Sequence, residues 1–265
     1  MLSRLELSED DHESLIDYCK LKKIEFLSTG FDIQAIDFLI KKNIKLIKIP
    51  SGNLTDLPYL KKIAQKNMPV ILSTGMANLQ EVSDAVSILI NNGLKKELLT
   101  LLHCTTQYPA PHEDINLMAI ETMRTKFDLE IGYSDHTLGV EASIAAVALG
   151  ASVIEKHFTL SRNFDGPDHK ASLEPDELKT MVKSIRNIEL SMGNGIKEPS
   201  QHEKENIAIA RKSIVASQNI LKGELYSDKN ITSKRPGCGL SPMLWDDLIG
   251  KPANKSYNQD DLIEL

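Results

Sequence analysis

Short apolar runs alternate with longer amphipathic segments along most of the chain. The apolar runs have the length and composition of buried strands, and they lie at 24–27, 46–49, 70–72, 99–102, 129–132 and 153–154. Between them, apolar residues recur every three or four positions, as in amphipathic helices, at 33–42, 57–65, 79–91, 118–125, 141–149 and 175–190. This alternation predicts parallel strands joined by right-handed crossovers, which is an α/β fold.

Every predicted strand ends in small, polar or ionisable residues. These ends lie at 28–31, 48–53, 73–76, 103–108, 134–136 and 155–157. In an open doubly wound sheet, only the strands beside the switch point need chemistry at their carboxyl ends. In a (β/α)₈ barrel, all strand ends meet at one site, so the pattern favours a TIM-type barrel. Six of eight strands are recognisable, and we expect the first two βα units to be absent.

The pattern changes after residue 190, where a Gly-containing break is followed by a polar helical connector and then by many turn signals. We therefore divide the chain into an incomplete barrel domain at 1–195, a linker at 196–211 and a small β-rich domain at 212–265.

Composition excludes several classes of function. The net charge of -6 argues against a general affinity for nucleic acid or anionic membranes. The sequence has neither the apolar core of a signal peptide near its start nor a run approaching the ~18 apolar residues of a membrane span. Three widely spaced cysteines, at 19, 104 and 238, suggest neither a disulfide framework nor a CxxC site, so we expect a cytoplasmic protein.

Two histidines, His136 and His157, follow consecutive predicted strands. Imidazole is a common ligand of Mn, Fe, Co and Zn, and rings on neighbouring strands can meet at one ion. Strand alternation places Glu155 on the same face as His157, which makes it a catalytic candidate. The alternative is that each histidine is a hydrogen-bonded structural residue.

Lys48 lies near the end of a predicted strand, with Ile49 between it and Pro50-Ser51-Gly52, and a second small-residue turn follows at 73–76. Exposed backbone N–H groups, hydroxyls and a lysine suit a phosphate or carboxylate. Ser, Thr and Gly are also favoured at ordinary helix N-termini, so these turns alone leave both interpretations open. Asp168, in a Pro- and Gly-containing loop at 165–170, is either a general acid/base or part of a solvated turn.

Seven motifs occur in a fixed order: LysIleProSerGly at 48–52, IleLeuSerThrGlyMet at 71–76, LeuLeuHisCysThrThr at 101–106 with TyrPro, GlyTyrSerAspHisThr at 132–137, GluLysHisPheThr at 155–159, GlyProAspHis at 166–169, and LysArgProGly at 234–237 with SerPro. Together they resemble the N-acetylneuraminate (sialic acid) synthase family, which includes legionaminate synthases. The resemblance covers nearly the whole chain.

The resemblance implies a barrel followed by a domain similar to type III antifreeze protein (SAF domain), in a domain-swapped homodimer. It implies that His136 and His157 hold a divalent cation, Mn²⁺ first and Mg²⁺ or Co²⁺ as alternatives, and that Asp168 faces the sugar. Arg235 would reach the acceptor sugar across the dimer. The residues implied for phosphoenolpyruvate are Lys48, Ser51, Ser73, Gly75 and Met76, with Thr29, Thr106 and Tyr108 beside them.

The implied reaction condenses phosphoenolpyruvate with N-acetylmannosamine to give N-acetylneuraminate and phosphate. Two alternatives are a legionaminate synthase, which uses a 2,4-diacetamido-2,4,6-trideoxy-mannose, and a non-catalytic remnant. A metal-dependent aldolase or hydrolase would leave the small C-terminal domain unexplained.

Two positions depart from the family pattern: Gly30 stands where Pro is usual, and Asn53, a candidate substrate-binding residue, stands where Glu is usual. Because the family's opening strands also contribute site residues, we expect little or no activity from the 265-residue chain alone.

Overall fold

The strands pair in the order in which they follow one another along the chain. The computed structural model describes residues 6–265, and its first unit, which ends at Gly193, contains a five-stranded parallel sheet in the order β1-β2-β3-β4-β5. The strands are β1 Ile47–Ile49, β2 Val70–Ser73, β3 Leu99–Cys104, β4 Glu130–Asp135 and β5 Ile154–Lys156.

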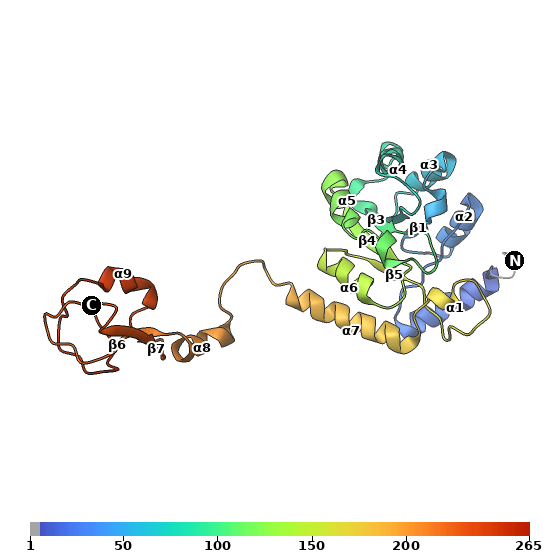
Figure 1. Cartoon of the computed structure of the whole chain (residues 1–265). Coiled ribbons are helices and arrows are strands. Elements are labelled where there is room, and N and C mark those ends of the chain that lie inside the picture. The colour runs from blue at the N-terminus through green and yellow to red at the C-terminus, as the bar shows by residue number, and fades with distance from the viewer. Residues whose placement is uncertain (1–5) are drawn as a thin grey trace. The chain divides into compact units, whose positions relative to one another are not determined.

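Helices alternate with these strands and lie around the outside of the curled sheet (Figure 1). They are α1 Glu9–Lys22, α2 Ile33–Lys41, α3 Leu57–Ala64, α4 Leu79–Asn91, α5 Ala119–Phe127, α6 Glu141–Ala148 and α7 Pro175–Ser191. The first unit is therefore a parallel half-barrel of the TIM type, and the predicted α/β barrel architecture is confirmed.

The core of this unit lies between the sheet and its helices. Ile47, Leu72 and Leu101, from three neighbouring strands, are completely buried against helix residues such as Leu60 and Leu89. Each fully buried Leu or Ile side chain contributes about 1.5–3 kcal/mol relative to an exposed one. This packing fixes the strands, and the strands bring their carboxyl ends to one edge of the half-barrel.

The strand predicted at 24–27 is wrong. These residues form no strand, and the segment reaches the sheet only through an isolated parallel bridge between Thr29 and Lys48. Ile24 and Leu27 are 65% and 46% exposed, so the apolar run is not buried between a sheet and a helix. A single bridge and two exposed apolar side chains leave little pairing or packing to hold the segment as a strand.

The second unit begins at Asn194 and is described by itself. It contains α8 Gln201–Ala210, β6 Ser213–Ala216, β7 Ile231–Lys234 and α9 Trp245–Leu248, and β6 pairs with β7 in antiparallel fashion. Ile214, Ile220, Leu248, Tyr257 and Ile263 belong to its own buried core. Within the described part of the chain, no helix is long and apolar enough to cross a membrane.

Candidate active site

The two histidines predicted as metal ligands lie side by side at the carboxyl ends of β4 and β5. The ring centroids of His136 and His157 are 5.2 Å apart, and the ring planes meet at 72°. His136 Nδ1 lies 2.7 Å from the carbonyl oxygen of Thr105, which can only accept, so Nδ1 carries the proton. The lone pair of the neutral His136 ring is therefore on Nε2, where it is available to a ligand.

His157 is held in a less buried position than His136. Its Nδ1 is 3.8 Å from Asp168 Oδ2, in the loop that follows β5. Burial lowers the pKa of His157 below its ordinary value, and the neighbouring His136 lowers that pKa further. At neutral pH this favours the uncharged imidazole, which is the form that binds a metal ion.

The ring of Tyr108 covers both histidines. Its centroid lies 4.2 Å from that of His136 and 5.3 Å from that of His157. Burial is the main cause that raises the pKa of Tyr108, so the phenol is neutral at physiological pH. Tyr108, predicted beside phosphoenolpyruvate, therefore forms an uncharged wall next to the imidazole pair.

A carboxylate and a lysine extend the site toward β1. Glu155 Oε1 accepts a hydrogen bond of 2.7 Å from Ser134 Oγ, and Glu155 Oε2 lies 3.5 Å from Lys48 Nζ. The side chain of Lys48 is only 11% exposed, so its charge faces the interior of the half-barrel and not bulk solvent. Lys48 and Glu155 thus come together from the first and last strands of the sheet.

A cluster of small side chains lies around Gly75, in the turn after β2. Ser51 Oγ accepts a hydrogen bond of 3.0 Å from the Gly75 N–H and lies 3.8 Å from Cys104 Sγ. A Cβ atom on Gly75 would lie 2.1 Å from Thr106 Oγ1 and 2.8 Å from Ser51 Oγ, so this position excludes a side chain. Glycine here lets backbone and hydroxyls approach one another, as an anion-binding turn requires.

Two of the predicted substrate-binding hydroxyls are buried without a hydrogen-bond partner among the described residues, Ser73 Oγ and Thr106 Oγ1. Buried hydroxyls are normally paired, so both have bonding capacity left for a ligand. Met76 follows Gly75 with a φ of 64° and is 71% exposed, so its side chain is not part of the core.

The other predicted binding residues are Thr29, Asn53 and Arg235. Thr29 bridges to Lys48 at the edge of the sheet. Asn53 Nδ2 donates a hydrogen bond of 3.1 Å to the carbonyl oxygen of Phe31, so its amide ties two loops together. Arg235 is exposed in the second unit.

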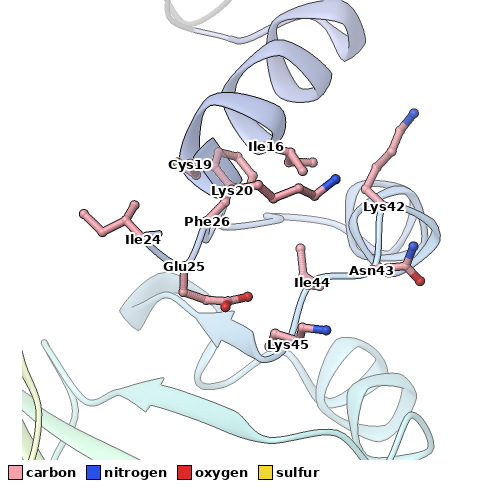
Figure 2. A pocket seen from close by; sticks show the side chains of 10 residues that line it. All are labelled: Ile16, Cys19, Lys20, Ile24, Glu25, Phe26, Lys42, Asn43, Ile44 and Lys45. Atoms are coloured by element: carbon pink, nitrogen blue, oxygen red, sulfur yellow. The ribbon is translucent and has the colours of Figure 1, made fainter. Parts of the chain in front are cut away.

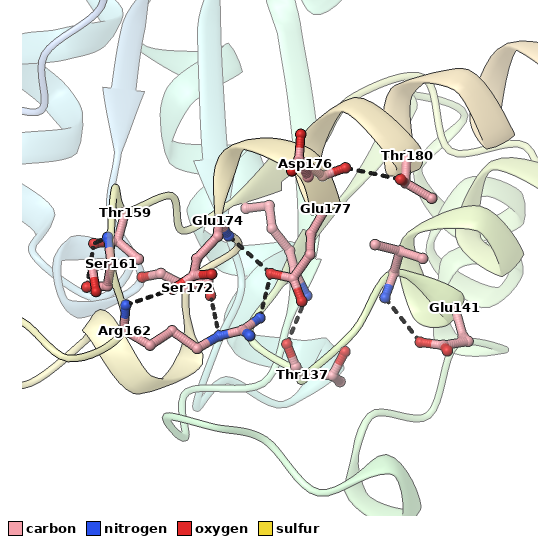
Figure 3. A network of polar contacts seen from close by, with 12 residues as sticks. Thr137, Glu141, Thr159, Ser161, Arg162, Ser172, Glu174, Asp176, Glu177 and Thr180 are labelled. Carbon is pink, nitrogen blue, oxygen red and sulfur yellow. Dashed lines mark hydrogen bonds and ion pairs between the residues drawn. The ribbon is translucent and has the colours of Figure 1, made fainter.

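Arg162 lies at the start of the loop that carries Asp168, and Figure 3 shows its contacts with Ser172, Glu174 and Glu177. The Arg162 N–H donates to Glu174 Oε1 at 2.9 Å, its Nε donates to the carbonyl oxygen of Ser172 at 3.0 Å, and its Nη2 is 2.5 Å from Glu177 Oε2. These contacts hold the start of the loop against the first turn of α7.

The residues that the sequence analysis missed are Cys104, Asp135 and Lys156. Cys104 Sγ lies 3.9 Å from His136 Nδ1, and burial raises the pKa of this thiol. Asp135 and Lys156 form a buried ion pair directly behind the two histidines. The available signal was their position: each immediately precedes one of the histidines at paired strand ends.

A separate pocket of about 310 Å³ lies at the opposite ends of the strands (Figure 2). It opens between the end of α1 and the segments that precede Thr29 and β1, and it is lined by Ile16, Cys19, Lys20, Ile24, Glu25, Phe26, Lys42, Asn43, Ile44 and Lys45. None of the predicted site residues lines it.

The parallel half-barrel with histidines, a lysine and hydroxyls at its strand ends is typical of barrel enzymes that act at this edge. Residues 1–197 match the NeuB family, and residues 211–264 match the SAF domain. The chain belongs to the NeuB family, whose members include sialic, legionaminic and pseudaminic acid synthases.

Individual relatives agree with this assignment. The chain is 53% identical over 263 residues to the N,N'-diacetyllegionaminic acid synthase of Campylobacter jejuni, covering 99% of this chain and 79% of the relative. It is 36% identical to the N-acetylneuraminate-9-phosphate synthase of Homo sapiens, covering 98% of this chain and 72% of that protein. The crystal structure of the spore coat polysaccharide biosynthesis protein spsE from Bacillus subtilis superposes with a TM-score of 0.69 at 36% identity, covering 98% and 77% of the two chains.

Proposed function

We propose that this protein condenses phosphoenolpyruvate with an N-acetylated amino sugar to give a nonulosonic acid and inorganic phosphate. The observation that carries the proposal is the meeting of two imidazoles, one lysine and a group of hydroxyls at one end of the half-barrel. Such a site can hold an anionic enol phosphate beside an aldehyde. Holding both reactants in one pocket raises the reaction rate because the reacting atoms are already oriented toward each other.

Phosphoenolpyruvate is anionic, and the residues around β1 and β2 offer the groups that bind anions. Lys48 supplies a nearly buried positive charge. Ser73 and Thr106 each supply a hydroxyl with unused bonding capacity, and the turn at Gly75 brings its backbone close to Ser51. Removing Lys48 would take this positive charge away from the substrate's carboxylate or phosphate.

The metal proposal rests on the donor set. Nε2 of His136 and the ring of His157 would hold the divalent cation, with Mn²⁺ as our first choice because imidazole and oxygen ligands both suit it. When bound, the ion would act as a Lewis acid toward the acceptor's carbonyl group. In the described residues no group of three or more His, Cys, Asp or Glu side chains converges in a metal-binding arrangement, so water or substrate would supply the remaining ligands.

The bonds that change follow from the two substrates. Carbon 3 of phosphoenolpyruvate forms a bond to the aldehyde carbon of the open-chain sugar, and the aldehyde oxygen takes up a proton to become a hydroxyl. Water adds to carbon 2 and loses a proton, and the resulting tetrahedral centre collapses to a ketone as phosphate leaves. Asp168, 3.8 Å from His157, is our candidate for moving a proton at the sugar oxygen.

For the acceptor we favour 2,4-diacetamido-2,4,6-trideoxy-mannose over N-acetylmannosamine. The support is the 53% identity to a diacetyllegionaminic acid synthase, against 36% to an N-acetylneuraminate-9-phosphate synthase. N-Acetylmannosamine is the second candidate.

We also propose a homodimer in which Arg235 of one subunit contacts the acceptor bound by the other. Arg235 is exposed in the small domain, and a guanidinium can donate hydrogen bonds to an N-acetyl carbonyl. An Arg235→Ala variant should raise the KM for the sugar and leave the KM for phosphoenolpyruvate unchanged. An equal rise in both would contradict this role.

The central experiment measures phosphate release from phosphoenolpyruvate with Mn²⁺ and each sugar separately. It uses the 265-residue chain and an N-terminally extended chain in parallel, because we expect the former to have little activity by itself. Release that depends on the diacetamido sugar supports the proposal, and preference for N-acetylmannosamine would replace the acceptor. If the extended chain releases no phosphate with either sugar, the synthase function is contradicted.

A further inference from the structure

Directly before each histidine of the site lies a charged residue that is almost completely buried. The side chains of Asp135 and Lys156 are 0% and 3% exposed, and Lys156 Nζ lies 2.9 Å from Asp135 Oδ2. The two residues are also Cα partners in the register between β4 and β5. The next residue on each strand is a site histidine, His136 or His157.

The carboxylate of Asp135 has further partners at the strand end and on α6. Its Oδ1 accepts hydrogen bonds of 2.8 Å from both the N–H and the hydroxyl of Thr137, and its Oδ2 accepts one of 2.6 Å from Ser143 Oγ on α6. Lys156 Nζ also donates to the carbonyl oxygen of Thr137 at 2.7 Å. Asp135 and Thr137, the residues on both sides of His136, are therefore fixed by hydrogen bonds, which also restricts the backbone of His136.

Stability alone does not account for this arrangement. A buried ion pair can often be replaced by apolar residues of similar volume at no cost in stability, because desolvating two charges offsets their attraction. The ion pair can, however, determine the register between the two strands. β5 has three residues, Ile154–Lys156, and a slip of one residue against β4 would turn His157 to the opposite face of the sheet. The pair between Asp135 and Lys156 forms in the observed register and would be lost in a shifted one.

We infer that Asp135 and Lys156 are positioning residues, which set the register of β4 and β5 so that the rings of His136 and His157 lie side by side. The inference deepens the proposed function and rests on it in one respect, that the two rings bind a metal ion. Neither charged group reaches the substrate site, since their side chains point from the sheet toward α6 and the Thr137 backbone.

The test uses the metal-free protein first. We would compare Lys156→Met, Asp135→Asn and the double variant Asp135→Leu/Lys156→Met, with Lys66→Met as the control. Lys66 pairs with Asp37 elsewhere in the same unit, and this pair is partly exposed, at 25% and 43%. The measurements are the thermal unfolding midpoint and nuclear Overhauser effects between the ring protons of His136 and His157.

We expect each single variant to lower the unfolding midpoint, because it leaves one buried charge without its partner. The double variant should recover the midpoint but not the ring-to-ring effects. A Mn²⁺ titration followed by electron paramagnetic resonance should then show its affinity still reduced about 10–100-fold, as for loss of outer-shell partners. The Lys66→Met control should change neither the ring contacts nor the affinity.

If the double variant shows the same ring-to-ring contacts as the wild type, the inference is overturned. The double variant gives this answer even if a single variant does not fold. A wild-type protein that shows the ring contacts but binds no Mn²⁺ would contradict the metal proposal. In that case the ring contacts of the variants still decide whether the ion pair positions the histidines.

Discussion

The two ends of the sheet carry similar sequence patterns but differ in how firmly the chain holds them. At the β4–β5 end, β3 and β4 share five registered pairs, and Asp135 and Lys156 lock the last residues of β4 and β5. At the other end, residues 24–29 reach the sheet through the single Thr29–Lys48 bridge. The strands at the first end and the segment 24–29 at the other are all apolar runs that end in polar residues. The difference teaches that an apolar run becomes a strand with a defined end only where several registered backbone pairs and buried side-chain contacts hold it.

The largest difference should appear in amide hydrogen exchange. The Tyr133 N–H donates to the carbonyl oxygen of Val153 within the sheet, whereas Ile24 to Leu27 belong to no strand. Opening free energies range from about zero in loosely held segments to the global stability in core strands. We expect exchange at Tyr133 to be slower than at residues 25–27 by several orders of magnitude, measured by NMR. Equal protection at the two ends would remove the basis of the comparison.

The second largest difference between the two ends should appear in the catalytic rate when a polar residue at each end is replaced. His157→Ala removes one of the proposed metal ligands, and loss of several kcal/mol of charge stabilisation corresponds to a rate at least about 100-fold lower. Thr29→Ala should lower the rate by less than about tenfold, because Thr29 lies at the loosely paired edge. The readout is kcat/KM for phosphate release from the N-terminally extended chain. A larger loss for Thr29→Ala would reverse our ranking of the ends.

Between the two ends, Gly75→Ala tests how tightly the proposed phosphoenolpyruvate site is packed. The new methyl group would lie 2.1 Å from Thr106 Oγ1, so the surrounding hydroxyls must move. Overpacking of this kind costs about 1–3 kcal/mol of unfolding free energy, and we also expect weaker phosphoenolpyruvate binding. Gly52→Ala is the matched control, because a Cβ there meets nothing within 4 Å. Denaturant unfolding and calorimetric titration measure both effects, and equal effects at the two glycines would contradict the packing argument.

The smallest effect should come from the loop after β5. Arg162→Ala removes the side-chain bonds to Ser172 and Glu177, and its partly exposed ion pair limits the expected cost to about 1 kcal/mol. Arg186→Ala, which breaks a more exposed pair with Glu189, should stay within about 0.5 kcal/mol. Chemical denaturation of both variants checks the order. If Arg186→Ala were the more destabilising, the loop would not be anchored through Arg162.

Local pattern was sufficient for most of the elements. The helix predicted at 79–91 has those bounds in the structure, because Asn78 caps its first turn and reciprocal bonds with Glu81 complete a capping box. The predicted strand cores at 70–72 and 99–102 also lie within β2 and β3. In each case the signal is contained in neighbouring residues, so a single sequence carries it.

The same kind of signal failed at 24–27. Its apolar run matches a strand as well as 70–72 does, but a strand is stabilised by partners distant in the sequence. The run specifies what the segment could bury, and the neighbours decide whether it is buried. Because the neighbouring strands and helices do not cover this segment, Ile24 is 65% exposed.

For the site, the sequence determined which strand ends carry His136, His157 and Lys48, because side-chain type and position are written in the chain. Only the tertiary structure decided that Lys48 meets Glu155, that Gly75 leaves no space for a Cβ, and that Asp135 pairs with Lys156. The physical reason is that hydrogen bonds and ion pairs depend on distances of a few ångströms between residues from separate strands. Those distances are set by register and packing.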